Sequence, residues 1–492
     1  MAARTGQEYL RGLKDARVLW VGDRQTTVLD EPSFSGSLKG VAGYFDWQHQ
    51  YAVDCLTTCP ETGEVMSASL IVPRSREDLR MRHKCFDRLA RYSVGMMGRT
   101  PDYVNVTLAG FVARSDALSS TGDPEPARRL KKFYREVVRG DLALTHTIVH
   151  ASIDRAVGDL TGQNAELALK VIKRTDTGVV VRGAKILATM GPFADELFVY
   201  PSAPLPPNAE PGHALMFSVP IGTPGVIQVC RDHYGYGTPA DQPFSSRFDE
   251  QDTVVIFDDV EIPYDRLFID GDIAAYNSLI RSGWHANVAQ QTNLRAAVKL
   301  EFAYDLGNRM AEVMNAEKRP EIAVALGEIL QYARMARASV VAGEAGARDW
   351  GNGAWFIEDA AVRATRGLLP GWMARTNEIL IQIGSHNLLA TPSLAAFDNP
   401  AMAGLLNKFI PGANGHTARE RAEVFRTAWD FVGSSLGNRI ALYERFYLGS
   451  AFRALSGEHM LYQMAKPKDA TGPVESLLGR GDEPASAKAV PA

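Results

Sequence analysis

The sequence predicts an α+β protein in which one block of strands lies between two helical regions. Apolar residues follow the 3.6-residue helical period up to about residue 140, form short β-rich runs up to about residue 271, and return to the helical period afterwards. This order lacks the strand-helix alternation of a dinucleotide-binding sheet, and the sequence contains neither GxGxxG nor GxxxxGKS/T. The usual grounds for a nicotinamide dehydrogenase or a P-loop enzyme are therefore missing.

The first region, residues 1–140, is expected to be an N-terminal helical domain. Its clearest segment is RRLKKFYREVVR, in which the apolar residues from Leu130 to Val138 recur at helical spacing. Acidic residues precede this segment, where a helix start favours them, so its basic residues are interpreted as a solvated face rather than an anion site.

Residues 141–271 are expected to form a middle β domain. Five runs rich in β-branched and aromatic residues are separated here by Gly, Pro and Asp. They read GVVVRGAK, ELFVYPSA, HALMFSVPI, GVIQVC and TVVIFDDVEIP.

Residues 272–465 are expected to form a C-terminal helical bundle. Apolar residues recur at helical spacing from Val298 to Met314 and again from Leu326 to Ala333. Long amphipathic helices bury their apolar faces against one another, so a bundle is the simplest arrangement. Residues 466–492 are rich in Pro, Gly, Ala and charge, and we expect them to be a mobile tail.

The composition narrows the classes of function. The chain has 492 residues, 46% of them hydrophobic and 22% charged, which suits a globular protein of several domains. A net charge of -4 argues against a nucleic-acid or anionic-membrane surface. The first residues lack the apolar core of a signal peptide, and no run approaches the ~18 apolar residues of a membrane span, so a cytoplasmic protein is expected.

Four cysteines, Cys55, Cys59, Cys85 and Cys230, are too few and too scattered for a disulfide framework. No His or Cys pair follows Cys55 and Cys59 at the spacing of a zinc site. We therefore expect reduced thiols and no metal site.

The segment GMMGRTPDYVN is the first candidate for chemistry. It places a cation, a carboxylate and a phenol, Arg99, Asp102 and Tyr103, within five positions just after an apolar helical run. Ordinary turn chemistry at Thr100-Pro101-Asp102, with Arg99 meeting the last carbonyls of the preceding helix, is the alternative.

A second candidate is LTHTIVHASIDR, which carries His146 and His150 next to Asp154 and Arg155 at the junction of the first two regions. Clefts form at such junctions, and histidine exchanges protons with a phenol near neutral pH. A structural histidine is the alternative for either residue. No Ser-His-Asp order and no HExxH motif supports a hydrolase.

Several of these motifs, taken in order, resemble those of a known family. GRTPDYVN, LTHTIVHASIDR, GAKILATMGPFADE, PFSSRFDEQDTVVIFDDVEIPYDRLF, NKFIPGANG and WDFVGSSLGNRIALYERFY closely resemble the 4-hydroxyphenylacetate 3-monooxygenase family, the oxygenase component of two-component flavin phenol hydroxylases, over roughly residues 5–450. The resemblance implies a fold similar to acyl-CoA dehydrogenases, with an N-terminal helical domain, a middle β domain and a C-terminal four-helix bundle, assembled as a homotetramer.

The resemblance also implies an activity. FADH2 from a separate NAD(P)H:flavin reductase would react with O2 to give a flavin hydroperoxide, which hydroxylates a phenol ortho to its hydroxyl and yields a catechol. Arg99, Tyr103 and His146 would be the catalytic residues, and Arg99 and His146 would also contact the flavin. The further residues that the resemblance places at the cofactor are Thr189, Gln382, Gly384, Ser385, Gly433, Ser434 and, as an additional candidate, Ser435.

The substrate loop departs from the family. It reads PSAPLPPNAEPG, where Ser202 is followed by Ala203 instead of a second hydroxyl residue. Hydroxyphenylacetate, a halophenol or nitrophenol, a simple phenol and a tyrosine-derived unit all stay open as substrates, as do FAD against FMN and a dimer against a tetramer. The alternative functions are a 4-hydroxybutyryl-CoA dehydratase-like or acyl-CoA dehydrogenase-like flavoenzyme, or a non-catalytic binding protein on the same scaffold.

Overall fold

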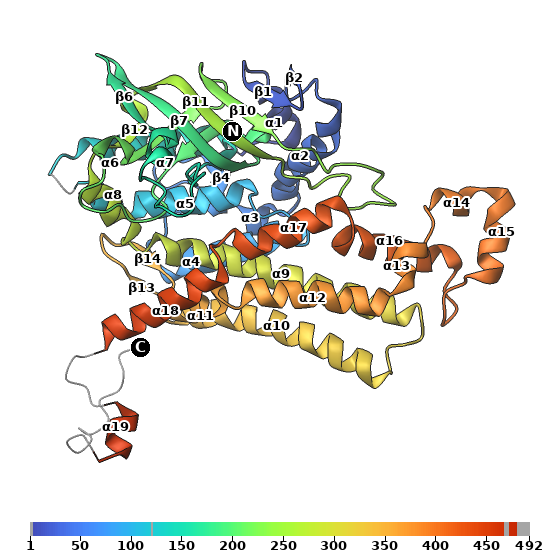
Figure 1. Ribbon diagram of the computed structural model, residues 1–492. Coiled ribbons are helices and arrows are strands. Elements are labelled where there is room, and N and C mark those ends of the chain that lie inside the picture. Colours follow the sequence, from blue (N-terminus) through green and yellow to red (C-terminus); the bar gives the residue numbers. More distant parts are fainter. Residues whose placement is uncertain (1–2, 120–121, 467–471, 480–492) are drawn as a thin grey trace.

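The computed structural model of the chain describes residues 3–119, 122–466 and 472–479. Its two larger sheets lie at one side of the molecule, and long helices run beneath them and continue into an arm (Figure 1). The predicted α+β fold class is confirmed. Within the described ranges, no helix is both long and apolar enough to cross a membrane.

The N-terminal region is mainly helical but also contains strands. Its helices are α1 (Gly6–Gly12), α2 (Ser35–Gln50), α3 (Ala52–Cys55), α4 (Arg76–Tyr92), α5 (Pro101–Ala113) and α6 (Glu125–Gly140). Its strands are β1 (Val18–Val21), β2 (Arg24–Thr26), β3 (Leu56–Thr58) and β4 (Val65–Ser67). The apolar residues of α6 from Leu130 to Val138 are buried, as its helical spacing predicts.

The middle region forms two sheets. Its strands are β5 (Leu144–His146), β6 (Lys170–Arg174), β7 (Gly178–Thr189), β8 (Glu196–Val199), β9 (Leu215–Pro220), β10 (Val226–Cys230), β11 (Asp252–Pro263) and β12 (Leu267–Asp270), and a short helix, α7 (Gln163–Leu167), precedes β6. One sheet has the order β2-β1-β10-β11-β7-β6 and the other β12-β9-β8-β5. All five predicted β runs are strands, and β1 joins the larger sheet by pairing in parallel with β10.

The two sheets share an apolar core. Along β11, buried and more exposed residues alternate through most of the strand, as expected for a strand with one face covered. Phe257 of β11 meets Phe217 of β9 edge to face, with ring centroids 5.9 Å apart. The loops and strand ends that reach the cavity described below extend from these packed sheets.

The C-terminal region is a helical bundle with extensions. Its helices are α8 (Ile273–Ile280), α9 (Trp284–Glu312), α10 (Pro320–Ala345), α11 (Ala360–Arg366), α12 (Leu369–Gly384), α13 (His386–Ala390), α14 (Ala395–Asp398), α15 (Pro400–Phe409), α16 (Ala418–Val432), α17 (Ser435–Phe446), α18 (Ala451–Ala465) and α19 (Pro473–Leu477). Two short strands, β13 (Arg348–Asp349) and β14 (Trp355–Phe356), pair with each other. Most of the tail predicted to be mobile, residues 467–471 and 480–492, lies outside the described residues.

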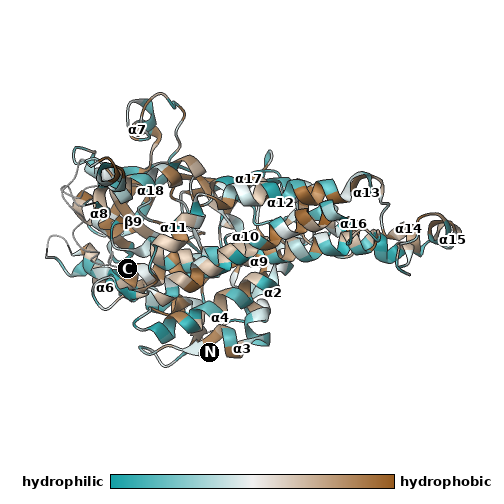
Figure 2. Cartoon of the chain, turned by 90° about the horizontal axis from the view of Figure 1, so that it is seen from below, coloured by the Kyte–Doolittle hydropathy of each residue, from teal (hydrophilic) through white to brown (hydrophobic). Residues whose placement is uncertain are grey.

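Helix α9 is the centre of this arrangement. It packs against α10, α12 and α16 in the bundle and against α4 and α5 of the N-terminal region (Figure 2). Its buried polar side chains are hydrogen-bonded across these contacts. Asn287 accepts a hydrogen bond from the Arg82 guanidinium at 2.6 Å and donates one to the Val106 carbonyl at 2.6 Å. Such satisfied polar contacts fix how the N-terminal helices sit on the bundle.

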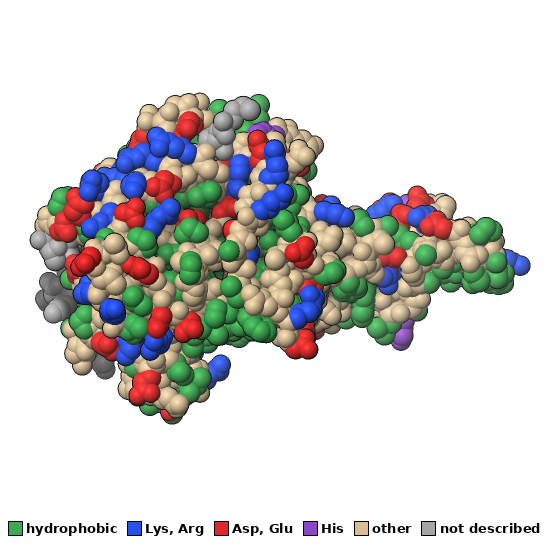
Figure 3. Space-filling model, turned by 90° about the horizontal axis from the view of Figure 1, so that it is seen from above, with side chains coloured by type: hydrophobic (Ala, Val, Ile, Leu, Met, Phe, Trp, Pro, Cys, Tyr) green, Lys and Arg blue, Asp and Glu red, His purple; other side chains and the backbone are tan. Residues whose placement is uncertain are grey.

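The far end of the bundle continues into a narrow arm built from α13, α14 and α15 (Figure 1). Figure 3 shows hydrophobic side chains along one edge of this arm. Leu405 and Phe409 of α15 are 51% and 68% exposed.

Candidate active site

A cavity of about 1350 Å³ opens between the strands and the C-terminal helices. Its wall combines the start of α5, the strand β5, the end of β7, the loop at residues 202–210 and parts of α8, α9, α11, α17 and α18. Pockets that hold one drug-sized ligand measure roughly 300–1,000 Å³. The cavity therefore has room for a second small molecule beside such a ligand.

Two glycines allow the chain to bring Arg99 to this cavity. Gly95 has a φ of 74°, and a Cβ there would lie 2.7 Å from the carbonyl oxygen of Arg295. A Cβ on Gly98 would lie 2.3 Å from the ring of Tyr443. Both distances are shorter than side chains tolerate, so the segment GMMG passes α9 and α17 only because these two positions lack side chains.

Arg99 is enclosed by aromatic rings. Its guanidinium carbon lies 3.9 Å from the ring centroid of Tyr103, 5.4 Å from that of Tyr443 and 5.3 Å from that of Tyr447. Burial opposes the charge of Arg99, but the surrounding tyrosine hydroxyls outweigh it and the pKa is raised. The guanidinium is therefore a fixed positive charge in the wall of the cavity, and among the described residues it has no carboxylate partner.

Asp102, the third polar residue of the motif, turns away from the cavity into the protein. Its carboxylate accepts hydrogen bonds from the Tyr44 hydroxyl at 2.9 Å and from the Gln291 amide at 2.8 Å. Burial raises the pKa of Asp102. Asp102 thus anchors the start of α5 to α2 and α9, while its neighbour Tyr103 lines the cavity.

His146 lies at the end of β5, and its ring stands beside two tyrosines. The ring centroids of Tyr103 and Tyr200 are 5.5 Å and 5.4 Å from that of His146. Burial, and then the charge of Arg99, lower the pKa of His146 well below 6.5, so the ring is neutral near pH 7. Its Nδ1 atom is buried and has no hydrogen-bond partner among the described residues. A buried polar atom of this kind indicates a place for a polar ligand.

Thr189 ends β7 at the cavity and is fixed on both sides. Its hydroxyl donates to Asp252 at 2.7 Å, and its carbonyl accepts from the Thr145 hydroxyl at 2.5 Å. Burial opposes the charge of Asp252, but Arg439 and Arg231 outweigh it and lower its pKa. Because the carboxylate is ionised and takes the hydroxyl hydrogen, Thr189 offers lone pairs toward the cavity.

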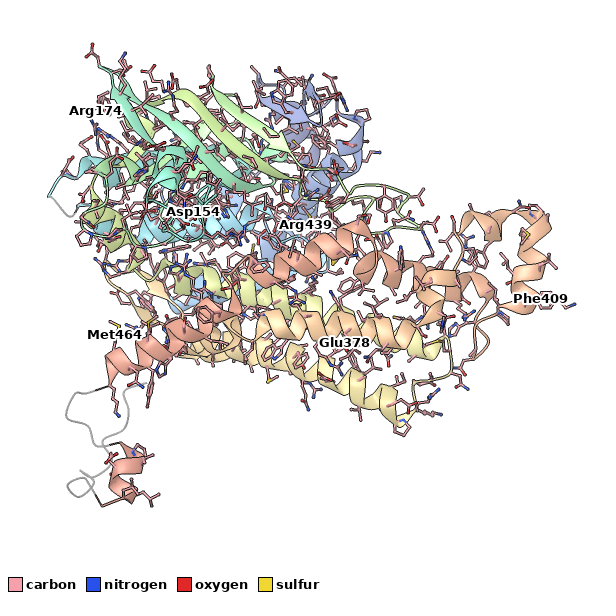
Figure 4. The ribbon with its side chains drawn as sticks, in the orientation of Figure 1. Asp154, Arg174, Glu378, Phe409, Arg439 and Met464 are labelled. Carbon is pink, nitrogen blue, oxygen red and sulfur yellow. The ribbon has the colours of Figure 1, made fainter. Side chains whose placement is uncertain are left out.

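Arg439 joins the two sides of the cavity. It projects from α17 where this helix passes beneath the sheet (Figure 4). It donates to Asp252 at 2.6 Å and to Glu250 at 3.0 Å. Glu250 in turn accepts the backbone N–H of Arg99 at 2.5 Å. One arginine therefore links the segments that carry Arg99 and Thr189.

The remaining predicted residues divide into two groups. Ser202 and Ala203 line the cavity, and the Ser202 hydroxyl donates to the Ile148 carbonyl at 3.3 Å. His150 also lines it, whereas Asp154 and Arg155 do not. The residues that the structure leaves outside the cavity of this chain are Gln382, Gly384, Ser385, Gly433, Ser434 and Ser435.

Two members of that outer group have local structural roles. The Ser434 hydroxyl caps α17 by accepting the N–H of Gly437 at 2.9 Å. A Cβ on Gly433 would lie 2.5 Å from the Trp429 ring. Gln382 and Ser385 are exposed near the end of α12, and a cofactor contact there stays a prediction.

Sequence reasoning missed part of the cavity wall. Arg439, Tyr443 and Tyr447 all line it from α17 and its last turn. They are spaced four residues apart in GNRIALYERFY, and this spacing places them on one helix face. That pattern was available in the sequence. Arg366 and Arg453 also line the cavity, but nothing in their local sequence distinguishes them from surface arginines.

The residues present fit a flavin and a phenol bound side by side. The cavity has the volume for both, Arg99 is a charge without a counterion, and the Tyr443 hydroxyl is buried without a hydrogen-bond partner among the described residues. Apolar and aromatic side chains such as Leu187 and Trp284 supply apolar surface for the rings. FAD and a phenol would satisfy the free polar atoms of this wall.

Comparison with known proteins identifies the family. The profile of the 4-hydroxyphenylacetate 3-hydroxylase N terminal region matches residues 5–269, and that of the C terminal region matches residues 277–479. The 4-hydroxyphenylacetate 3-monooxygenase oxygenase component of Thermus thermophilus is 34% identical over 471 residues, which cover 95% of this chain and 96% of the relative.

Two further proteins extend the comparison. A monooxygenase of Streptomyces globisporus, named for a 3-chloro-4-hydroxyphenyl substrate held on a peptidyl-carrier protein, is 30% identical over 96% of this chain and 89% of its own length. The crystal structure of a 4-hydroxyphenylacetate 3-monooxygenase oxygenase component complexed with FAD and 4-hydroxyphenylacetate superposes with a TM-score of 0.89, at 32% identity, over 97% of this chain and 98% of that one. The two profile matches span most of the sequence, and the chain therefore belongs to the 4-hydroxyphenylacetate 3-hydroxylase family.

Proposed function

We propose that this chain is the oxygenase component of a two-component, FAD-dependent monooxygenase that hydroxylates a phenol ortho to its hydroxyl. The observation that carries the proposal is the presence of Arg99, Tyr103 and His146 on the wall of one cavity with room for two ligands. Relatives of the same length named as such oxygenase components support the reaction class. O2 would be the source of the oxygen atom, and reduced FAD bound in the cavity would supply the two electrons that the reaction needs.

Arg99 and His146 suit a phenol hydroxyl. A positive charge near that oxygen stabilises phenolate character and so makes the ortho ring carbon more nucleophilic. The neutral ring of His146 has one nitrogen that can accept a hydrogen bond from the phenol hydroxyl. Tyr103 adds a hydroxyl that can donate to the same oxygen.

Thr189 suits the reduced form of the cofactor. Its hydroxyl hydrogen is given to Asp252, so toward the cavity it can only accept a hydrogen bond. Reduced flavin has an N–H on its central ring where oxidised flavin has an acceptor nitrogen. A hydroxyl restricted to accepting therefore favours reduced FAD, which agrees with its supply by a separate reductase.

We propose phenols as the class of substrate, without naming one compound. Ser202 offers a hydroxyl that already donates to Ile148, and Ala203 beside it has no polar atom, so this loop provides a weak site for an acidic substituent. The relatives differ in the phenol that their names give, from 4-hydroxyphenylacetate to a carrier-bound chlorophenol unit.

The dehydratase alternative requires thiolates that hold an iron-sulfur cluster. None of the four cysteines belongs to the wall of the cavity, and each of them is buried elsewhere. The geometry thus favours the oxygenase over this alternative.

We further propose a homotetramer that works in the cytoplasm. The exposed apolar side chains of the arm, including Leu405 and Phe409, support contact with other copies of the chain. All four cysteines are free, which agrees with a reducing compartment.

The proposal can be tested with the purified chain and chemically reduced FAD. The two are combined without oxygen and then mixed with oxygenated buffer and a panel of phenols, and catechol and hydrogen peroxide are quantified. We expect one class of phenols to give catechol with little hydrogen peroxide. Hydrogen peroxide without catechol from every phenol would contradict the proposal.

Variants of the cavity residues test whether the reaction takes place in this cavity. We expect Arg99→Gln and His146→Gln each to lower the rate of catechol formation about 10²-fold, because each removes a group that contacts the reacting phenol. His49→Gln is the matched control, since His49 is an exposed histidine of α2 outside the cavity. Equal activity of His146→Gln and His49→Gln would show that His146 has no catalytic role.

A further inference from the structure

One wall of the cavity carries positive charge that the proposed chemistry at Arg99 does not use. Five arginines line the cavity. Arg363 pairs with Asp359 at 2.6 Å and with Glu458 at 2.8 Å, and Arg439 pairs with Glu250 and Asp252. Within the described part of the chain, Arg366 and Arg453 have no carboxylate partner. These two arginines leave a net positive charge where α11 and α18 meet.

Arg366 is held in place by the backbone. Its guanidinium donates to the carbonyl of Leu448 through Nε at 2.8 Å and also through Nη2. Leu448 lies in the turn between α17 and α18, and Gly449 follows it with a φ of 86°. The contact therefore fixes both the arginine and the start of α18, the helix that carries Arg453 in its first turn.

The two arginines act on the same region of the cavity. Burial, and then the charges of Arg366 and Arg453, lower the pKa of His285 to about 3. This cavity-lining histidine is therefore neutral near pH 7, and the positive charge here comes from the two arginines. Arg366 donates to Leu448, the residue that follows Tyr447, and Tyr447 lines the same cavity and stacks against Arg99. The other acidic residues on the wall, Asp159 and Glu210, belong to loops of the middle region, and Glu210 pairs with Lys170.

We infer that Arg366 and Arg453 form an anion subsite of the cavity, which binds a phosphate or carboxylate group of a ligand whose ring lies at Arg99, Tyr103 and His146. Two cationic side chains that pair with no carboxylate of the described residues, one of them fixed by the backbone, suit the bidentate recognition of such oxygens. The inference rests on the proposed function for the identity of the ring. Two sources of the anion fit, the acidic substituent of the phenol and the phosphates of the flavin.

Binding measurements test the subsite without turnover. Dissociation constants are measured anaerobically for reduced FAD, FMN and riboflavin, and for 4-hydroxyphenylacetate and its neutral amide, with wild type, Arg366→Gln and Arg453→Gln. A charge-assisted hydrogen bond is worth enough to change affinity about tenfold or more. We expect each variant to raise the dissociation constant of the anionic ligands of one series about tenfold, and that of the neutral ligand of the same series less than twofold.

The pattern of losses identifies the source of the anion. Loss confined to 4-hydroxyphenylacetate assigns the subsite to the substrate, and loss confined to FAD and FMN assigns it to the cofactor. Equal weakening of charged and neutral ligands, or no weakening, overturns the inference. Arg445→Gln is the control, because Arg445 is an exposed arginine of the same α17 turn as Glu444 and does not line the cavity. A similar loss in Arg445→Gln would mean long-range electrostatics and would also overturn it.

Two variants distinguish a loss of anion binding from a loss of folding. Arg453 is exposed, so Arg453→Gln is expected to fold even if loss of the Leu448 contact destabilises Arg366→Gln. Arg366→Lys retains the charge and should recover part of the lost affinity. If the chain binds anionic ligands selectively but forms no catechol, the proposed function fails and the anion subsite stands. If the chain forms catechol but binds charged and neutral ligands equally well in the wild type and the variants, the proposed function stands and the anion subsite fails.

Discussion

Glu444 of α17 is the buried carboxylate whose removal should destabilise the protein most clearly. Its side chain is 3% exposed. Its two oxygens accept hydrogen bonds from Arg295 at 2.9 and 2.8 Å and from Lys299 at 2.9 Å. Burial opposes the charge of Glu444, but Arg295 and Lys299 outweigh it and lower its pKa from 4.5 to about 2.

Two arguments give the stability that Glu444 contributes. A carboxylate whose pKa falls from 4.5 to about 2 on folding stabilises the protein by about 3 kcal/mol at neutral pH. This stabilisation is fully present above pH 4.5 and is lost as the pH falls toward 2. Removal of one partner of a buried ion pair costs roughly 3–5 kcal/mol, because the other charge remains buried. We therefore expect Glu444→Gln to lower the free energy of unfolding by about 3–5 kcal/mol.

The measurement is urea unfolding at pH 7, followed by tryptophan fluorescence, with Glu328→Gln as the control. Glu328 also pairs with an arginine, Arg375, but the two side chains are 30% and 37% exposed. An exposed pair contributes at most about 1 kcal/mol, so the control should change little. The reasoning is refuted if Glu444→Gln loses less than 1 kcal/mol, or no more than Glu328→Gln.

Three further predictions concern packing and protonation. A Cβ on Gly40 of α2 would lie 1.9 Å from the carbonyl oxygen of Arg247, whereas one on the exposed Gly371 of α12 would meet no described atom within 4 Å. Gly40→Ala should therefore lower the free energy of unfolding measured in urea, and Gly371→Ala should leave it unchanged or raise it by up to about 1 kcal/mol. Burial lowers the pKa of Lys185 from 10.5 to about 7, so unfolding takes up a proton between these values and stability rises with pH there. Lys185→Met should be more stable than wild type at pH 7, with an advantage that shrinks toward pH 10; thermal unfolding at both pH values checks this, and a constant difference would contradict it. Because the pKa of His146 lies well below 6.5, catechol formation should show no inflection from this residue between pH 6 and 8, and a wild-type inflection that His146→Gln lacks would disprove its neutrality.

Much of the fold could be predicted from local patterns. The helical spacing in RRLKKFYREVVR predicted the buried face of α6, and the five β-rich runs predicted β7 to β11. These predictions succeed because a period of 3.6 or 2 residues is set by neighbours in the chain. The addition of β1 and β2 to the larger sheet was not predicted, since pairing with β10 depends on residues about 200 positions away.

The sequence by itself determined the order of helical and β regions and supplied Arg99, Tyr103 and His146 as candidates, because spacing and residue type are properties of the chain. Only the tertiary structure decided that Asp102 faces Tyr44 and Gln291 rather than the cavity. It also decided that Gln382 and Ser434 lie outside the cavity of this chain, and that Arg366 and Arg453 reach the cavity without a carboxylate partner in the described part of the chain. The physical reason is that burial, charge pairing and the direction of a side chain arise where distant segments pack together, and no local pattern records those contacts.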